Sequence, residues 1–315
     1  MNVAAESHQH FLTSLAIDPS TDELYALCAA SGEVLRYNAE RQTFTEVAKT
    51  DVPPASFAFL TDGEEMRWVM ACPMQRTLLT TSATVRQRVV EEGTEELPVV
   101  TLAPYAACSH APPLNAPTAV TVSPCDGEVF FTDAGWEGDS SLLNRTGAVY
   151  RTVQRHSAVV ALQPTGLAQP SSVVVGRDGC VYVAEMVENR LLRYVPRGGG
   201  VRYIGAVFAR FEGSMGPSAV VVHPRTGHLF VALYEAAEVG RPYEAVDDET
   251  SSTAPPLQGR VVELDLSGAE VCTYHVPDTQ LRALAFDVQG TCLYAVSSDS
   301  NTYWSTLYQA ALNEN

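Results

Sequence analysis

Apolar runs alternate with short polar turns along the chain, and the same order of features recurs six times. Each copy starts with a small residue, continues through an apolar run and a Gly-, Asp- or Pro-rich turn, and ends in a second run of β-branched and aromatic residues. This order is typical of two antiparallel strands joined by a tight turn. The copies are TSLAIDPSTDELYALC (13–28), ASFAFLTDGEEMRWVMAC (55–72), TAVTVSPCDGEVFFTD (118–133), SSVVVGRDGCVYVAE (171–185), SAVVVHPRTGHLFVAL (218–233) and RALAFDVQGTCLYAVS (282–297).

Two more strand-like runs follow four of these copies, such as GEVLRYN and TFTEVAK after the first. A strand-rich unit that recurs about every 40–50 residues is typical of the blades of a β-propeller. The pattern therefore predicts an all-β fold with four-stranded blades, a six-bladed β-propeller that occupies residues 1–315 as a single domain. The predicted blades start near residues 13, 55, 118, 171, 218 and 282.

The last blade is one strand short, because only TYWSTLYQAAL follows TCLYAVS, whereas AESHQHF stands ahead of the first copy. We expect this N-terminal segment to supply the outer strand of blade six, which closes the ring and removes an exposed sheet edge. Three polar or Pro-rich intervals predict loop insertions, at residues 103–117, 134–146 and 235–258. Loops of this length often carry function.

The formal net charge of −17 argues against nucleic acid as a partner, because nucleic-acid binding needs a basic surface. No apolar run approaches the roughly 18 residues that would predict a membrane span. The N-terminal MNVAAESHQHF lacks the basic flank and apolar core of a secretory signal, so we expect a cytoplasmic protein. The seven cysteines include no C-x-x-C pair, and most lie in strand-like surroundings. They predict buried reduced thiols rather than disulfides or a zinc site.

Residues 116–234 carry a family resemblance. The segments GEVFFTDAGWEGDSSLLNRTGAVYRT, VYVAEMVENRLLRYVPRGG and GPSAVVVHPRTGHLFVALYE resemble blades of the strictosidine-synthase-like and gluconolactonase/paraoxonase group of six-bladed propellers. NHL repeats share the same outline, and the two are not separated by these segments. The resemblance implies the propeller fold and, for the hydrolase members, a central calcium held by Glu, Asn, Asn and Asp side chains at the entries to the innermost strands.

The matching column here contains neither a carboxylate nor an amide, and consists of Thr13, Ala55, Thr118, Ser171, Ser218 and Arg282. Carboxylates supply most of the affinity for calcium, so we expect no metal and no cofactor. The Glu on which the strictosidine synthase reaction depends is also missing from the matching segment, PDTQLRALAF. Two interpretations of the column stay open. The Arg282 guanidinium could take the place of the cation, or the pore could be filled with water and lined by small polar groups.

Several other residues have a functional and a structural interpretation. His8 and His10 would share one face of a strand, where they could bind metal, although a solvated strand is the simpler interpretation. Asp133 and Glu185 end the second strands of blades three and four and could act as acid or base. We favour a structural role, in which Glu185 pairs with Arg190 across a short turn.

The column of hydroxyls and one arginine favours a non-catalytic scaffold over an enzyme. Such a scaffold would bind a protein or small molecule through the loops on one face, with Trp136 and His110 among the contacts. In the central pore, we expect a ligand to be bound by the column residues Thr13, Thr118, Ser171, Ser218 and Arg282. The alternative is a lactone or ester hydrolase with a rearranged central site. The sequence leaves the partner, the ligand and the oligomeric state open.

Overall fold

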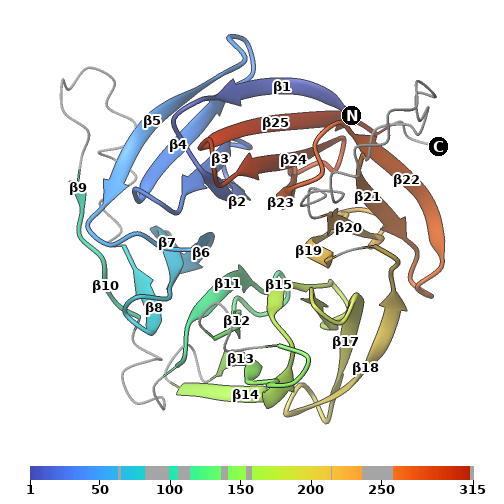
Figure 1. The fold of residues 1–315 in the computed structure, drawn as a ribbon. Coiled ribbons are helices and arrows are strands. Elements are labelled where there is room, and N and C mark those ends of the chain that lie inside the picture. The colour runs from blue at the N-terminus through green and yellow to red at the C-terminus, as the bar shows by residue number, and fades with distance from the viewer. Residues whose placement is uncertain are drawn as a thin grey trace, which may run out of the picture.

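The computed structural model describes residues 1–62, 65–81, 99–105, 114–135, 141–153, 158–213, 215–235 and 258–312. Within these ranges the regular elements are strands, and none is a helix. The strands form six sheets that surround a central axis as blades (Figure 1). The predicted six-bladed β-propeller is confirmed. Among the described residues, no helix is long and apolar enough to cross a membrane.

The first three blades follow the order of the chain, except that the short β9 after blade two's third strand joins blade one. Blade one contains β2 (Leu12–Ile17), β3 (Leu24–Cys28), β4 (Glu33–Asn38) and β5 (Thr43–Thr50), and the short β9 (Val99–Val100) adds to β5 in parallel. Blade two contains β6 (Ser56–Asp62), β7 (Glu65–Cys72), β8 (Thr77–Thr80) and β10 (Ala103–Pro104). Blade three contains β11 (Pro117–Val122), β12 (Val129–Asp133), β13 (Gly147–Val153) and β14 (Ala158–Leu167).

Blades four and five repeat this order, and blade six draws on both ends of the chain. Blade four contains β15 (Pro170–Val175), β16 (Val181–Glu185), β17 (Arg190–Arg197) and β18 (Arg202–Arg210). Blade five contains β19 (Gly216–Val222), β20 (Leu229–Tyr234), β21 (Gly259–Leu264) and β22 (Glu270–Val276). Blade six contains β23 (Leu281–Phe286), β24 (Cys292–Asp299), β25 (Trp304–Ala311) and β1 (Asn2–Ser7).

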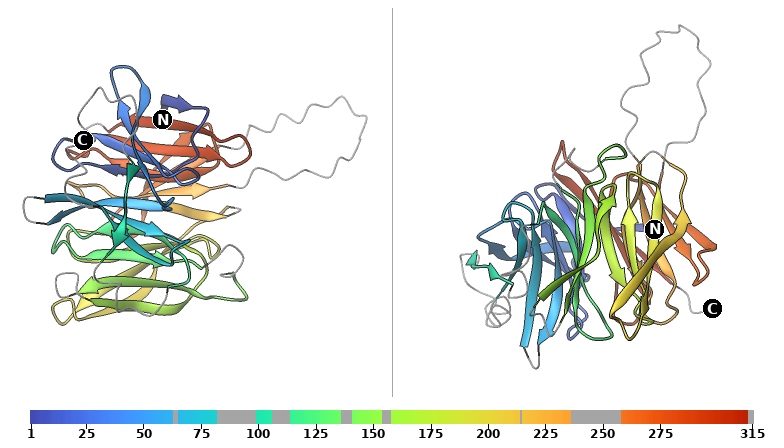
Figure 2. Two further views of the ribbon diagram at one scale, coloured as in Figure 1. Left: turned by 90° about the vertical axis from the view of Figure 1, so that its left-hand side faces the viewer. Right: turned by 90° about the horizontal axis from the view of Figure 1, so that it is seen from below.

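The ring closes as the sequence predicts. Strand β1 pairs antiparallel with β25 and forms the outer strand of blade six. Each innermost strand packs beside the innermost strands of its two neighbours, and β2 packs beside β23 where the ring closes. Figure 2 shows the ring from the side, with neighbouring sheets facing each other. The N-terminal segment therefore joins the first and last blades.

The hydrophobic core lies between the blades. Phe130 of blade three packs with Val173 and Val183 of blade four, and Phe230 of blade five packs with Leu293 of blade six. Each such side chain gains about 1.5–3 kcal/mol from full burial. Because the second strand of a blade is buried on both faces, it is a nearly continuous apolar run, as in β3, β12 and β16.

The turn between the first two strands follows one design in five blades. A residue with positive φ ends the turn, and it is Gly127, Gly179, Gly227 or Gly290 in blades three to six, with φ between 70° and 75°. Asp22, with φ of 60°, takes this place in blade one. Glycine adopts this left-handed conformation without a steric cost, and Asp tolerates it better than most residues. This explains the recurring Gly in the sequence copies.

The intervals predicted as insertions are only partly described. Residues 103–104 form β10 rather than part of a loop, because their backbone pairs with Leu79 and Thr80 of β8. The described residues 134–135 and 141–146 contain no strand. Residues 106–113, 136–140 and 236–257 lie outside the described residues.

Candidate functional site

A cavity of about 660 Å³ lies on the propeller axis and is lined by the innermost strands of all six blades. Its wall includes the whole predicted column, Thr13, Ala55, Thr118, Ser171, Ser218 and Arg282. These residues stand where the innermost strands begin, and we call this side of the ring the entry face. Cavities of this size are large enough to bury a small organic ligand.

A β-bulge places each column residue. In five blades the residues on either side of the column residue pair with consecutive residues of the second strand, so the column residue has no partner of its own. In blade two, the amide of Ala55 donates to Ala71 O at 2.8 Å while Ser56 also pairs with Ala71. A bulge redirects a side chain and occurs often beside functional sites. The repeated bulge therefore turns six side chains toward the axis.

The hydroxyl groups of the column bond to the backbone of the blades. Thr13 Oγ1 donates to Ala55 O at 3.0 Å, and Ser171 Oγ donates to Pro217 O at 2.9 Å. Ser218 Oγ donates to Ala232 O at 3.3 Å. Thr13 and Ser171 thus bond to the backbone of the next blade, and Ser218 bonds to the backbone of its own blade. Their hydroxyl hydrogens are already engaged, and what they offer the cavity is a lone pair.

Arg282 brings a positive charge to the entry face. Its Cζ lies 4.8 Å from the ring centre of Tyr234 and 5.2 Å from that of Phe11, so the guanidinium is held between two aromatic rings. Nε donates to Ser298 O at 3.4 Å, and Nη2 donates to the Tyr234 hydroxyl at 3.5 Å. Arg282 is one of the residues that line the axial cavity. Whether it replaces a cation there stays a prediction.

The donor set of the column does not fit calcium. Calcium takes about six to eight oxygen ligands and draws its affinity from carboxylates. The column offers only four hydroxyl groups, and the Arg282 guanidinium would repel a dication at the same place.

Two buried carboxylates at the entry face have structural partners. Asp133, 1% exposed, accepts hydrogen bonds from the amides of Asn115 at 2.7 Å and Ala116 at 2.6 Å. Glu185, fully buried, accepts from the amide of Ala168 at 2.6 Å and from Arg190 Nε at 2.6 Å. Both carboxylates thus fasten the chain that enters an innermost strand to the end of the second strand.

The predicted pair of Glu185 and Arg190 is confirmed. Burial would lower the pKa of Arg190, but the hydrogen bond and the charge of Glu185 outweigh it and raise this pKa. Glu235, 5% exposed, makes a similar pair with Arg260 at 2.9 Å in blade five. Sequence reasoning missed it, because residues 236–259 separate Arg260 from Glu235 in the chain.

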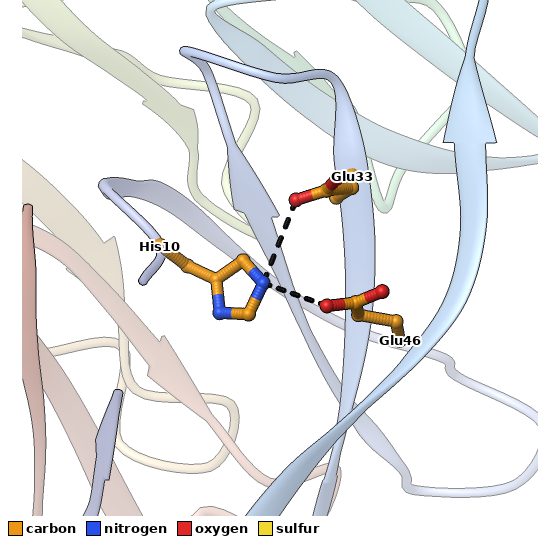
Figure 3. A group of neighbouring side chains, drawn as sticks. All are labelled: His10, Glu33 and Glu46. Atoms are coloured by element: carbon orange, nitrogen blue, oxygen red, sulfur yellow. Dashed lines mark hydrogen bonds and ion pairs between the residues drawn. The ribbon is translucent and has the colours of Figure 1, made fainter. Parts of the chain in front are cut away.

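His8 and His10 do not lie on a strand, since β1 ends at Ser7 and β2 begins at Leu12. The His8 ring contacts Trp304, with ring centres 4.2 Å apart. His10 is 12% exposed rather than solvated, and its Nε2 lies 2.9 Å from Glu46 Oε1 and 3.5 Å from Glu33 Oε2 (Figure 3). The expected solvated strand is therefore wrong for His10, because the connection from blade six folds over blade one.

The remaining sequence candidates divide in two groups. Trp136 and His110 lie outside the described residues, as does Cys108.

Cys28, Cys72 and Cys180 are buried free thiols, and Cys292 is half-buried. Cys125 and Cys272 are exposed, which corrects the prediction of buried thiols. Cys125 lies in the turn after β11, and Cys272 lies on the outer strand β22, whose first three residues are exposed.

No known protein family matches the sequence, and no curated protein does either. Solved structures match the fold over nearly the whole chain. Regucalcin from Agrobacterium tumefaciens, described as a calcium-binding protein, has 16% identity and a TM-score of 0.68, with 97% of this chain and 92% of that chain covered. A luciferin-regenerating enzyme has 14% identity and a TM-score of 0.70, covering 97% and 92%. A gluconolactonase from Xanthomonas campestris has 16% identity and a TM-score of 0.68, covering 98% and 89%.

These neighbours contradict the predicted non-catalytic scaffold, because two of them are named as enzymes. The scaffold prediction depended on the missing carboxylates of one column. Their replacement changes the chemistry at the axis but leaves a cavity that can hold a substrate. At this level of identity the likeness establishes the fold: the chain is a six-bladed β-propeller with the architecture of regucalcin and gluconolactonase.

Proposed function

We propose that this protein hydrolyses small lactones or esters in the axial cavity, at a site arranged around Arg282. The observation that carries the proposal is the position of Arg282, which lines the cavity from a bulge at the entry face and whose guanidinium contacts the rings of Phe11 and Tyr234. The shared architecture with a gluconolactonase supports the reaction class.

The chemistry follows from what a guanidinium offers to a carbonyl group. Water adds to the carbonyl carbon of the substrate, and the oxygen that gains negative charge accepts hydrogen bonds from Arg282. The carbon–oxygen ester bond then breaks, the leaving alkoxide takes one proton of the attacking water, and the acid product releases the other proton to solvent. The Tyr234 hydroxyl, 3.5 Å from Arg282 Nη2, can relay the proton to the alkoxide, giving up its own proton and taking one from the attacking water. The carboxylate product matches the guanidinium in charge and shape.

In this proposal Arg282 supplies the positive charge at the axis, and the reaction uses no calcium. The partner is a small molecule that enters at the entry face. Six free thiols among the described residues support a reducing compartment such as the cytoplasm.

Steady-state hydrolysis of a panel of aliphatic lactones and aryl esters tests the proposal. We expect turnover by the wild type, a loss of about 10²–10³-fold in kcat/KM for Arg282→Met, and a smaller loss for Tyr234→Phe. Arg193→Met is the matched control, because Arg193 also lies over two aromatic rings, Tyr182 and Phe208, but does not line the cavity. Absence of turnover across the panel, or equal activity in Arg282→Met, would overturn the proposal.

A further inference from the structure

The structure assigns a second site, separate from the axial cavity: we propose that His10, Glu33 and Glu46 bind a divalent transition metal ion, with Zn²⁺ as the best fit. The three side chains offer one imidazole nitrogen and two carboxylate oxygens, all within 4.8 Å of one another. Imidazole and carboxylate together are a common donor set for zinc. Figure 3 shows both carboxylates facing the same ring nitrogen of His10.

The spacing of the donor atoms suits a tetrahedral ion. Bonds of about 2.1 Å in tetrahedral geometry separate neighbouring ligand atoms by roughly 3.4 Å. His10 Nε2 lies 3.5 Å from Glu33 Oε2, which already agrees with this value. The distance from Nε2 to Glu46 Oε1 is 2.9 Å and needs to open by a few tenths of an ångström. Glu46 is 37% exposed and can make that movement.

Neighbouring groups hold the ligands in place, as the outer partners of metal sites do. Ser7 Oγ lies 2.7 Å from His10 Nδ1, and a proton on Nδ1 that is donated to Ser7 leaves Nε2 as the ligand atom. Ser31 Oγ donates to Glu33 Oε2 at 2.7 Å. Lys49 Nζ contacts the other oxygen, Glu33 Oε1, at 3.2 Å, so the ammonium does not occupy the oxygen that faces His10.

The position of the cluster gives the ion a structural consequence. Glu33 lies on β4 and Glu46 on β5, both in blade one. His10 lies in the connection from β1, the outer strand of blade six, to β2, the innermost strand of blade one. A bound ion would therefore tie the connection that closes the ring to blade one. Because the unfolded chain does not hold these residues together, binding stabilises the native state.

Calorimetric titration with ZnCl₂ and thermal unfolding with and without the ion test this site without an activity assay. We expect one Zn²⁺ per chain and a rise in Tm of a few degrees once the ion is about 100-fold above its Kd. His10→Ala should lose the binding and the shift. Glu46→Gln, which keeps the size of the side chain, should weaken binding at least tenfold and serves if His10→Ala does not fold.

The matched control is His228→Ala. His228 Nδ1 lies 2.7 Å from Glu263 Oε1, so this variant removes another partly buried histidine that is paired with a carboxylate. It should bind Zn²⁺ as the wild type does. No binding by the wild type, or binding that persists in both His10→Ala and Glu46→Gln, would refute the site. The hydrolase proposal is unaffected by either result, since none of these residues lines the axial cavity.

Discussion

Two arginines of this propeller are held in the same way in different places. Arg193 lies over the rings of Tyr182 and Phe208 at 5.8 and 5.6 Å, and Arg282 lies over Tyr234 and Phe11 at 4.8 and 5.2 Å. Arg193 stands within the sheet of blade four, where its neighbours include the carboxylate of Asp178 at 3.5 Å. Arg282 stands at a bulge on the wall of the axial cavity.

Both guanidinium groups contact two aromatic rings, so it is their position in the fold that gives them different roles. In the blade, the rings and Asp178 fix a charge that stabilises the sheet. At the axis, the rings restrict the guanidinium of a residue that lines a space large enough for a ligand. A charged group that is held rigid in advance is what stabilises the charge of a transition state. Replacement of Arg282 should therefore lower the activity, whereas replacement of Arg193 should lower the stability and leave the activity unchanged.

The largest effect is expected at the axis. Arg282→Lys keeps the charge but loses the planar fork that binds two substrate oxygens at once. We expect its kcat/KM to fall by about tenfold to a hundredfold, which is less than for Arg282→Met. A stopped assay on the best substrate of the panel measures this. If lysine restored full activity, the fork geometry would have no role and a simple point charge would suffice.

The pair of Glu185 and Arg190 tests how much a buried ion pair contributes to the stability of the fold. Glu185→Gln removes the charge that faces Arg190 and should lower the free energy of unfolding by about 3 kcal/mol, near the low end for a broken buried pair because Arg190 is 16% exposed. Urea titration gives the value. Glu23→Gln, which disrupts the more exposed pair with Arg36, is the control and should cost less than about 1 kcal/mol. Equal losses in the two variants would remove the structural role assigned to Glu185.

The blade arginine should affect stability alone. Arg193→Met loses two cation–π contacts and the pair with Asp178, and we expect a loss of about 1 kcal/mol, since the side chain is 32% exposed. Its kcat/KM should match that of the wild type. A fall in activity without a change in the urea midpoint would contradict the distinction between the two arginines.

The smallest effect concerns the thiols. Burial, with a further contribution from Asp51, raises the pKa of Cys72 to about 12, so this thiol stays protonated at neutral pH. Because the thiolate is the nucleophile, iodoacetamide should leave Cys72 unmodified in the native protein. The exposed Cys125 and Cys272 should be alkylated first. Peptide mass spectrometry after a timed reaction shows the order, and early alkylation of Cys72 would mean that blade two opens readily.

The repeats predicted the ring, the six blades and the closing strand, because each copy carries its own strands and turn. They also located the column that lines the cavity. The bulges could not be predicted, since a residue that is skipped in the pairing looks like any other residue at the start of a strand. The His10 cluster could not be predicted either. Its three residues meet only because ring closure brings the β1–β2 connection over blade one.

The most direct test of the central claim measures hydrolysis in EGTA and in millimolar CaCl₂, with wild type and His10→Ala. The His10→Ala variant separates the effect of a metal at the axis from that of a metal at His10, Glu33 and Glu46. If Arg282 provides the charge at the axis, both proteins should turn over the substrate equally well in the two buffers. Activity that disappears in EGTA and returns with calcium, in both proteins, would contradict the account and show that a metal ion acts at the axis.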